Sequence, residues 1–189
     1  HIFTLYCDRK GRMWIGTFGG GLDLAIQEND GYTFRHFFTK TFGQRRTRAI
    51  IEDSNGWIWV GNSDGVYVFS PDSLQADPQN YLTYNYNNGK LRSNEIKCIY
   101  QDTQNRIWIG SSGGGLSMCI PGTDYRNLTF KHYGTSNGLV NDMVQAIAED
   151  KQGNLWIATE YGISRFNPET QAFDNYFFSA YTLGNVNSD

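Results

Sequence analysis

The chain has 189 residues, a formal net charge of −3 and an aromatic content of 15%. Its lysines and arginines form no basic stripe of the kind that neutralises nucleic-acid phosphates, and no apolar run reaches the length of a membrane span. We therefore expect neither nucleic acid as a partner nor a membrane segment within these residues. The short basic stretch QRRTR at 44–48 is predicted to be a solvated loop.

A group of glycines follows the first strand-like apolar pattern, in RMWIGTFGGG at 12–21. Gly16 and Gly21 have the spacing of a phosphate-binding loop, which also needs a Lys and a Ser or Thr after its last glycine. Leu22 and Asp23 stand there instead, and an acidic side chain would repel a phosphate. The glycines are therefore interpreted as a turn between two strands, and no cofactor is expected.

The unit around this turn recurs three more times. Related sequences occupy 57–66, 106–116 and 154–163, and the tryptophans at their centres are 45, 49 and 48 residues apart. This period, with several short strands per unit, is typical of a β-propeller blade. An Asp stands six residues before each of these tryptophans. The predicted structural anchors are Asp8, Asp53, Asp102, Asp150, Trp14, Trp59, Trp108 and Trp156. We expect each Trp to be buried, so that loss of Trp59 or Trp156 should unfold the chain.

The residues after each anchor Asp predict a tight hairpin turn. Gly11, Gly56 and Gly153 stand three positions later, and Asn105 takes this place in the third unit. An Asp side chain bonds the backbone two residues on, while Gly and Asn tolerate the positive φ that closes a turn. A calcium site is the alternative, but four carboxylates on separate turns do not form the dense oxygen set that calcium requires. No metal site is predicted.

Two further strands complete each unit. The third strands begin at the glycine turns, and the fourth are aromatic runs at 32–38, 81–86, 128–133 and 172–178. No stretch shows helical periodicity. The sequence therefore predicts an all-β fold, a β-propeller fragment of four four-stranded antiparallel blades in one segment over 1–189. The predicted blades are about 1–43, 44–91, 92–141 and 142–189.

Residues of the kinds that catalyse reactions are few and scattered. Cys7, Cys98 and Cys119 hold non-equivalent places in their units, which predicts core packing and no disulfide framework. His36 and His132 hold matching places in the fourth strands of different blades, which favours edge-strand packing over a shared metal site. No GxSxG nucleophile elbow is predicted, and no HExxH motif is present. No catalytic residue is predicted. A pair of catalytic carboxylates from two different blades, as in glycoside hydrolysis, is the alternative that the sequence leaves open.

One end of the predicted propeller is the expected ligand-binding face. In an up-and-down blade the turns between strands two and three share that end with the crossovers between blades, so loops converge there on a rigid scaffold. Aromatic rings with Arg, Asn and Asp suit a sugar. The candidate ligand-binding residues are Phe18, Arg45, Arg46, Asn62, Asp64, Arg92, Asn94, Ser112, Asn141, Asp142, Glu160 and Tyr161. An acidic oligosaccharide would need Arg45, Arg46 or Arg92.

The repeated unit resembles the two-component regulator propeller repeat. The resemblance is carried by FTLYCDRKGRMWIGTFGGGL, RAIIEDSNGWIWVGNSDGV, KCIYQDTQNRIWIGSSGGGL and QAIAEDKQGNLWIATEYGI, and the connector SNGLVNDMV at 136–144 also fits. It covers essentially the whole chain and departs at Ala158, where glycine is usual. A repeated match of this length is specific for the repeat family, though not for a ligand.

The resemblance implies a sensor. Similar proteins are the periplasmic regions of hybrid histidine kinases of Bacteroidetes, which commonly detect oligosaccharides. By this resemblance we expect a periplasmic recognition fragment, not an enzyme, that signals to a histidine kinase absent from these residues. The alternatives are a propeller enzyme acting on polysaccharide, such as a lyase or glycosidase, and a protein-interaction platform.

The expected partners include the remaining blades and output domains of a longer parent protein. The sequence starts without a methionine or a signal peptide, which predicts a piece of such a protein. The outward faces of the first and last blades would lack neighbouring blades and would leave apolar patches exposed. This predicts a homo-oligomer in which two copies of the chain join end to end and close an eight-bladed ring. A four-bladed ring closed within one chain is the alternative.

Overall fold

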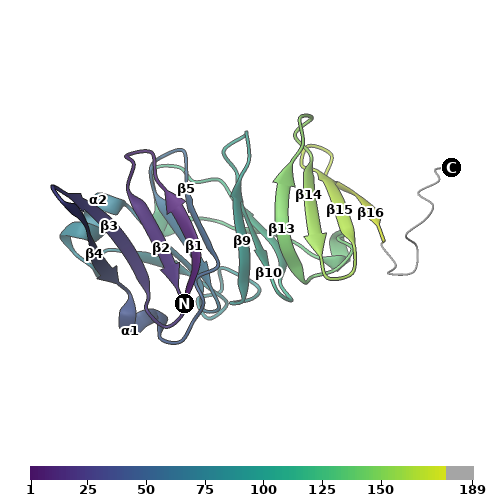
Figure 1. The fold of residues 1–189 in the computed structure, drawn as a ribbon. Helices are drawn as coiled ribbons and strands as arrows, with labels where there is room; N and C mark the ends of the chain where they lie inside the picture. The colour runs from purple at the N-terminus through teal and green to yellow at the C-terminus, as the bar shows by residue number, and fades with distance from the viewer. Residues whose placement is uncertain (178–189) are drawn as a thin grey trace.

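The computed structural model describes residues 1–177 and arranges them as an open arc of four sheets, one after another along the chain (Figure 1). Each sheet is antiparallel and keeps its four strands in sequence order. The strands of the first two blades are β1 (Ile2–Cys7), β2 (Met13–Thr17), β3 (Leu22–Glu28), β4 (Gly31–Phe37), β5 (Ala49–Glu52), β6 (Ile58–Asn62), β7 (Gly65–Phe69) and β8 (Leu82–Tyr84). Those of the last two are β9 (Ile96–Gln101), β10 (Ile107–Ser111), β11 (Gly115–Cys119), β12 (Lys131–Tyr133), β13 (Val144–Glu149), β14 (Leu155–Thr159), β15 (Ile163–Asn167) and β16 (Ala172–Tyr176).

The predicted fold, an all-β propeller fragment of four antiparallel blades, is confirmed. Phe178, the last residue of the predicted fourth strand of blade 4, lies outside the described residues, as does the remainder of 178–189. Short helices also occur in the connections, where the sequence predicted none. α1 (Thr39–Phe42) buries Phe42, whose ring stacks on Phe38 at 4.8 Å between centroids. The others are α2 (Pro71–Ala76), η1 (Tyr125–Asn127) and η2 (Thr135–Asn137). Helices this short cannot show a helical repeat in the sequence.

A hydrogen bond between the anchor Asp and the anchor Trp recurs in every blade. The indole Nε1 donates to the carboxylate Oδ2 six residues earlier. The distances are 2.9 Å for Trp14 to Asp8, 2.8 Å for Trp59 to Asp53, 2.8 Å for Trp108 to Asp102 and 2.9 Å for Trp156 to Asp150. The other oxygen, Oδ1, accepts the backbone N–H groups two and four residues after the Asp. Each carboxylate therefore binds N–H donors of its own turn and strand, and it holds both in place.

The segment after each anchor Asp is the predicted hairpin turn. The N–H of the residue three positions later donates to the Asp carbonyl, at 2.8 Å from Gly11 to Asp8 and 2.9 Å from Asn105 to Asp102. Gly11 has a φ of 77°, and Asn105 has a φ of 61°. Asn can replace Gly in the third blade because it adopts the left-handed backbone region more readily than other side chains do.

Each buried anchor Trp packs against the next blade of the arc. The ring centroid of Trp14 lies 5.4 Å from that of Phe69 in blade 2, and the Trp108 centroid lies 5.7 Å from that of Phe166 in blade 4. Two residues after each of these tryptophans, a glycine leaves room for the first residues of the next blade. An added Cβ would lie 2.6 Å from Thr47 at Gly16, from Ile96 at Gly61 and from Val144 at Gly110. Such an approach is closer than any side chain allows, so these glycines set the spacing between blades.

A second contact joins neighbouring blades at the opposite end of the sheets. Glu52, just before the anchor Asp of blade 2, accepts the backbone N–H of Arg9 in blade 1 at 2.7 Å. Glu149 of blade 4 accepts the backbone N–H of Thr103 in blade 3 at 2.9 Å and its hydroxyl at 2.7 Å. The hairpin turn of one blade is thereby fastened to the first strand of the next.

The two ends of the arc are not joined, since blade 1 and blade 4 lie at opposite ends of Figure 1. The alternative of a four-bladed ring closed within one chain is therefore wrong. Among the described residues no blade follows blade 4, and Trp156 is 37% exposed, whereas the three other anchor tryptophans are at most 1% exposed. The expectation that every anchor Trp is buried is wrong for Trp156, because in blades 1 to 3 the ring is buried by the following blade.

The different burial of the anchors predicts different costs for losing them. Trp59→Ala should lower the free energy of unfolding by about 3–5 kcal/mol, the usual cost of deleting a fully buried aromatic ring. Trp156→Ala should cost clearly less, because part of its ring already faces solvent. Urea unfolding followed by circular dichroism measures both. Equal losses for the two variants would show that exposure does not set their contributions.

The anchor carboxylate of Asp150 predicts a loss of stability in acid. The hydrogen bond from Trp156 lowers the pKa of Asp150 to about 2. Because this pKa lies below the unfolded value of about 3.9, the contribution of Asp150 is complete above that value and is lost as pH falls toward 2. The stability advantage of the wild type over Asp150→Asn should therefore shrink between pH 5 and pH 2. Urea unfolding across this range tests the prediction, which a pH-independent difference would contradict.

Candidate ligand-binding site

The turns between second and third strands lie beside the crossovers between blades. Phe18 in the first such turn forms a β-bridge with Arg46 in the first crossover. Ser112 in the third turn donates its N–H to the carbonyl of Glu95 in the second crossover at 2.9 Å. We call these turns and crossovers together the loop face. It comprises the turns at 18–21, 62–64, 112–114 and 160–162 and the crossovers at 44–48, 92–95 and 141–143.

Several predicted ligand-binding residues are used to hold the loops. Asn62 accepts the N–H of Asp64 at 2.7 Å, and Asp64 accepts the hydroxyl of Tyr67 at 2.9 Å. Asn94 and Asn141 accept backbone N–H groups at 2.7 Å and 2.8 Å. Their amide and carboxylate oxygens therefore shape the turns in which they lie.

Asp142 and Arg45 fasten loops in the same way. The Asp142 carboxylate accepts the backbone N–H of Thr135 at 2.8 Å, and its backbone carbonyl accepts the N–H of Gly113 at 2.9 Å. Arg45 donates to the carbonyl of Phe42 at 3.3 Å and lies 3.4 Å from the carboxylate of Asp64. This arginine therefore closes the C-terminal end of α1.

The other predicted residues lie in two separate places. Those over blades 3 and 4 are Arg92, Ser112, Glu160 and Tyr161. Tyr161 is 68% exposed, and the carboxylate of Glu160 accepts a hydrogen bond from Gln145 at 3.2 Å. Phe18 and Arg46 lie together at the junction of blades 1 and 2. The structure therefore does not gather all the predicted residues in one pocket.

A cavity of about 260 Å³ opens on the loop face where the first three blades meet. Its lining residues are Phe18, Gln44, Arg46, Arg48, Ser63 and Glu95. Phe18 and Arg46 were predicted from the sequence, and the four others were not. The stretch QRRTR contained the missed Arg48, but we interpreted it as a solvated loop. Nothing in the irregular crossover indicates which of its side chains face the cavity.

Aromatic and charged groups fix the two arginines of this cavity. The guanidinium of Arg46 lies 5.4 Å from the ring centroid of Phe18 and 5.5 Å from that of Phe3. Such cation–π contacts hold the group in one place. The Nε of Arg48 lies 3.7 Å from the carboxylate of Glu95, which also lies 3.1 Å from the ammonium of Lys97. The cavity thus presents fixed hydrogen-bond donors to whatever enters it.

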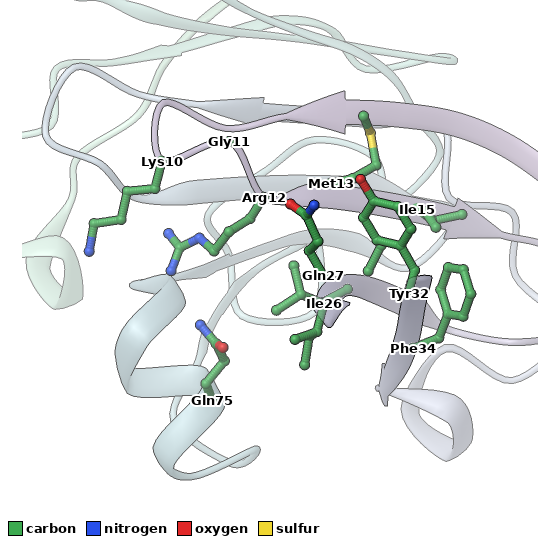
Figure 2. A pocket seen from close by; sticks show the side chains of 12 residues that line it. Lys10, Gly11, Arg12, Met13, Ile15, Ile26, Gln27, Tyr32, Phe34 and Gln75 are labelled. Atoms are coloured by element: carbon green, nitrogen blue, oxygen red, sulfur yellow. The ribbon is translucent and has the colours of Figure 1, made fainter. Parts of the chain in front are cut away.

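A wider hollow, of about 570 Å³, lies on blade 1 (Figure 2). Figure 2 shows Met13, Ile15 and Tyr32 among the side chains around it. Met13 and Ile15 correspond in sequence to Ile58 and Val60 of blade 2, which are fully buried in the core between blades 1 and 2. The hollow is therefore the uncovered half of a contact between blades, and its composition does not single it out as a site for a small ligand.

Metal binding finds no support in the side-chain arrangement of residues 1–177. No three or more His, Cys, Asp or Glu side chains there are placed to hold a metal ion together. No helix within the same residues is both long and apolar enough to cross a membrane.

The four repeats match one known type of propeller repeat. The sequence profile described as "Two component regulator propeller" matches four segments of the chain, at 1–19, 42–64, 90–113 and 138–161. The four repeats belong to the two-component regulator propeller family. The resemblance seen in the sequence is thereby confirmed, and each matched segment contains one anchor Asp and one anchor Trp.

Solved structures similar to this two-component regulator propeller are larger sensor domains. The extracellular domain of a hybrid two component system from B. thetaiotaomicron is 28% identical, with a TM-score of 0.77 over 93% of this chain and 23% of that one. A second such domain from the same organism is 22% identical, with a TM-score of 0.75 over 93% of this chain and 25% of that one. The expected periplasmic location agrees with these neighbours, which are extracellular domains.

A curated relative is named as a histidine kinase. Histidine kinase P4 of Formosa agariphila is 22% identical over 167 residues, which make up 87% of this chain and 12% of that protein. The propeller repeats described here thus span a small part of the kinase and about a quarter of the solved sensor domains.

Proposed function

We propose that this chain is the ligand-sensing propeller region of a periplasmic hybrid two-component sensor, and that its loop face recognises an oligosaccharide. The repeat family and the extracellular domains similar to the chain support the sensor role. The observation that carries the binding role is the cavity on the loop face, where side chains of three successive blades meet on rigid sheets.

The cavity has the donors that sugar hydroxyl groups need. Gln44, Ser63 and the guanidinium groups of Arg46 and Arg48 can each donate hydrogen bonds, and Glu95 can accept one. Its volume of about 260 Å³ is below that of typical ligand pockets, roughly 300–1,000 Å³. It therefore suits one sugar unit of a longer chain, whose other units would extend over the loops of blades 3 and 4.

Binding at this place offers a physical route to a signal. The cavity joins a turn of blade 1, a turn of blade 2 and the crossover into blade 3, so a ligand that contacts all three favours one arrangement of the blades over others. A change in blade arrangement would pass to the parts of the parent protein that carry the kinase.

A panel of neutral and acidic oligosaccharides tests this function. At least one glycan should raise the melting temperature of the chain, since a ligand that binds only the folded state stabilises it by mass action. Chromatography of the same mixtures should show the glycan unchanged. Absence of any shift across the panel would contradict the sensor proposal, and a shortened or unsaturated product would instead assign the chain to a glycosidase or a lyase.

We also propose that two copies associate end to end, because the ends of the arc carry opposite halves of one contact. Blade 4 supplies the exposed ring of Trp156, and blade 1 supplies the hollow at Met13. Ile2 stands six residues before its anchor Asp, as Ile96 does in blade 3, and Ile96 packs on Gly61 of the preceding blade. In the proposed junction Ile2 would pack on Ala158, which replaces that glycine in blade 4.

Ala158→Gly should therefore strengthen the association of the two copies, and Trp156→Ala should weaken it. Light scattering at micromolar concentration measures both, and a 21.5 kDa monomer for every variant would contradict the proposal.

A further inference from the structure

The charge at the cavity is opposite to that of the whole chain. The chain carries a formal net charge of −3. The cavity, however, is lined by the two guanidinium groups of Arg46 and Arg48 and by a single carboxylate, that of Glu95. This carboxylate also lies 3.1 Å from Lys97, so its own charge is largely compensated. A positive potential in a recess of an acidic protein favours an anionic group.

Arg46 is held in place without a carboxylate partner. No ion pair of Arg46 occurs among residues 1–177, although most other arginines there pair with Asp or Glu. Its guanidinium lies against both the Phe3 and the Phe18 ring, whose centroids are 6.3 Å apart. Phe18 therefore helps to position Arg46. The N–H groups of Arg46 are left to bind an acceptor that arrives from outside.

Buried polar atoms without partners lie beside Arg46. Arg48 Nε, Asn62 Nδ2 and Thr47 Oγ1 are each buried and form no hydrogen bond. They are neighbours in the fold, because Thr47 and Arg48 are consecutive and the N–H of Arg48 donates to the carbonyl of Gly61 at 2.9 Å. A buried donor that lacks an acceptor is costly. The buried Nε of Arg48 faces the Glu95 carboxylate at 3.7 Å, beyond hydrogen-bond distance, while the Arg48 side chain lines the cavity.

We infer that the cavity is a subsite for an anion, the sulfate or carboxylate group of an acidic oligosaccharide. The guanidinium of Arg46, supported by that of Arg48, donates to its oxygens, because planar guanidinium groups match such oxyanions with paired hydrogen bonds. This inference rests on the proposed recognition of oligosaccharides. It also separates the three arginines named from the sequence. Arg45 is committed to α1 and Asp64, Arg92 lies in the next crossover, and Arg46 alone lines the cavity.

Matched pairs of ligands and variants test the subsite. Isothermal titration should compare an oligosaccharide that carries sulfate or uronate groups with its neutral counterpart of the same length. Arg46→Gln should weaken binding of the acidic ligand about tenfold or more and leave the neutral ligand unchanged, since a charge-assisted hydrogen bond is lost. Arg126→Gln is the matched control, because Arg126 is exposed in η1 at the opposite end of the blades. It should bind both ligands as the wild type does.

Inorganic sulfate provides a readout that does not depend on sugar binding. At low millimolar concentration, sulfate should raise the melting temperature of the wild type more than chloride at equal ionic strength, and Arg46→Gln should reduce this difference to the general salt effect of sulfate. If acidic and neutral glycans bind equally, or if the preference for acidic glycans survives in Arg46→Gln, the anion subsite is overturned while oligosaccharide sensing stands. If no glycan binds, the proposed oligosaccharide recognition fails. The melting measurements with sulfate then decide by themselves whether the anion subsite exists. A sulfate effect that requires Arg46 supports the subsite, and its absence overturns it.

Discussion

The hydrogen bond from each anchor Trp to the Asp six residues earlier is the interaction on which this fold depends. Asp8, Asp53 and Asp102 are buried, and a buried carboxylate is tolerated only where donors surround it. Two backbone N–H groups and one indole bind the anchor carboxylate in every blade, including the partly exposed Asp150 of blade 4. The bond ties the hairpin turn to the second strand and fixes the direction of the indole ring. In blades 1 to 3 that direction faces the next blade, so an interaction local in sequence also sets the packing between sheets.

Much of this could be predicted from the sequence because it is repeated and local. The six-residue spacing of Asp and Trp, the hairpin turns and the replacement of Gly by Asn105 all depend on residues a few positions apart. The exposure of Trp156 could not be predicted in this way, because it depends on what stands beyond the end of blade 4. The short helix α1 was missed since its stability comes from burying Phe42 against Phe38, a tertiary contact.

The cavity on the loop face shows where sequence reasoning stops. Crossovers have no regular alternation, so neighbouring arginines in QRRTR take different directions that the sequence does not indicate. Arg45 turns back to the carbonyl groups of α1, whereas Arg46 and Arg48 line the cavity. Asn and Asp residues in these loops are equally ambiguous. Their side chains suit a sugar, but they suit turns equally well, and Asn62, Asn94 and Asn141 bond backbone N–H groups of their own loops.

The glycines that follow the anchor tryptophans also limit how such blades can be rearranged. Gly16, Gly61 and Gly110 let the next blade approach to a distance at which a Cβ would lie 2.6 Å from its first residues. Blade 4 carries Ala158 at this position. Although the four blades share one fold, blade 4 is therefore not interchangeable with the others. Gene duplication or recombination that moved it to an earlier place in the arc would force two sheets apart, unless the alanine changed at the same time.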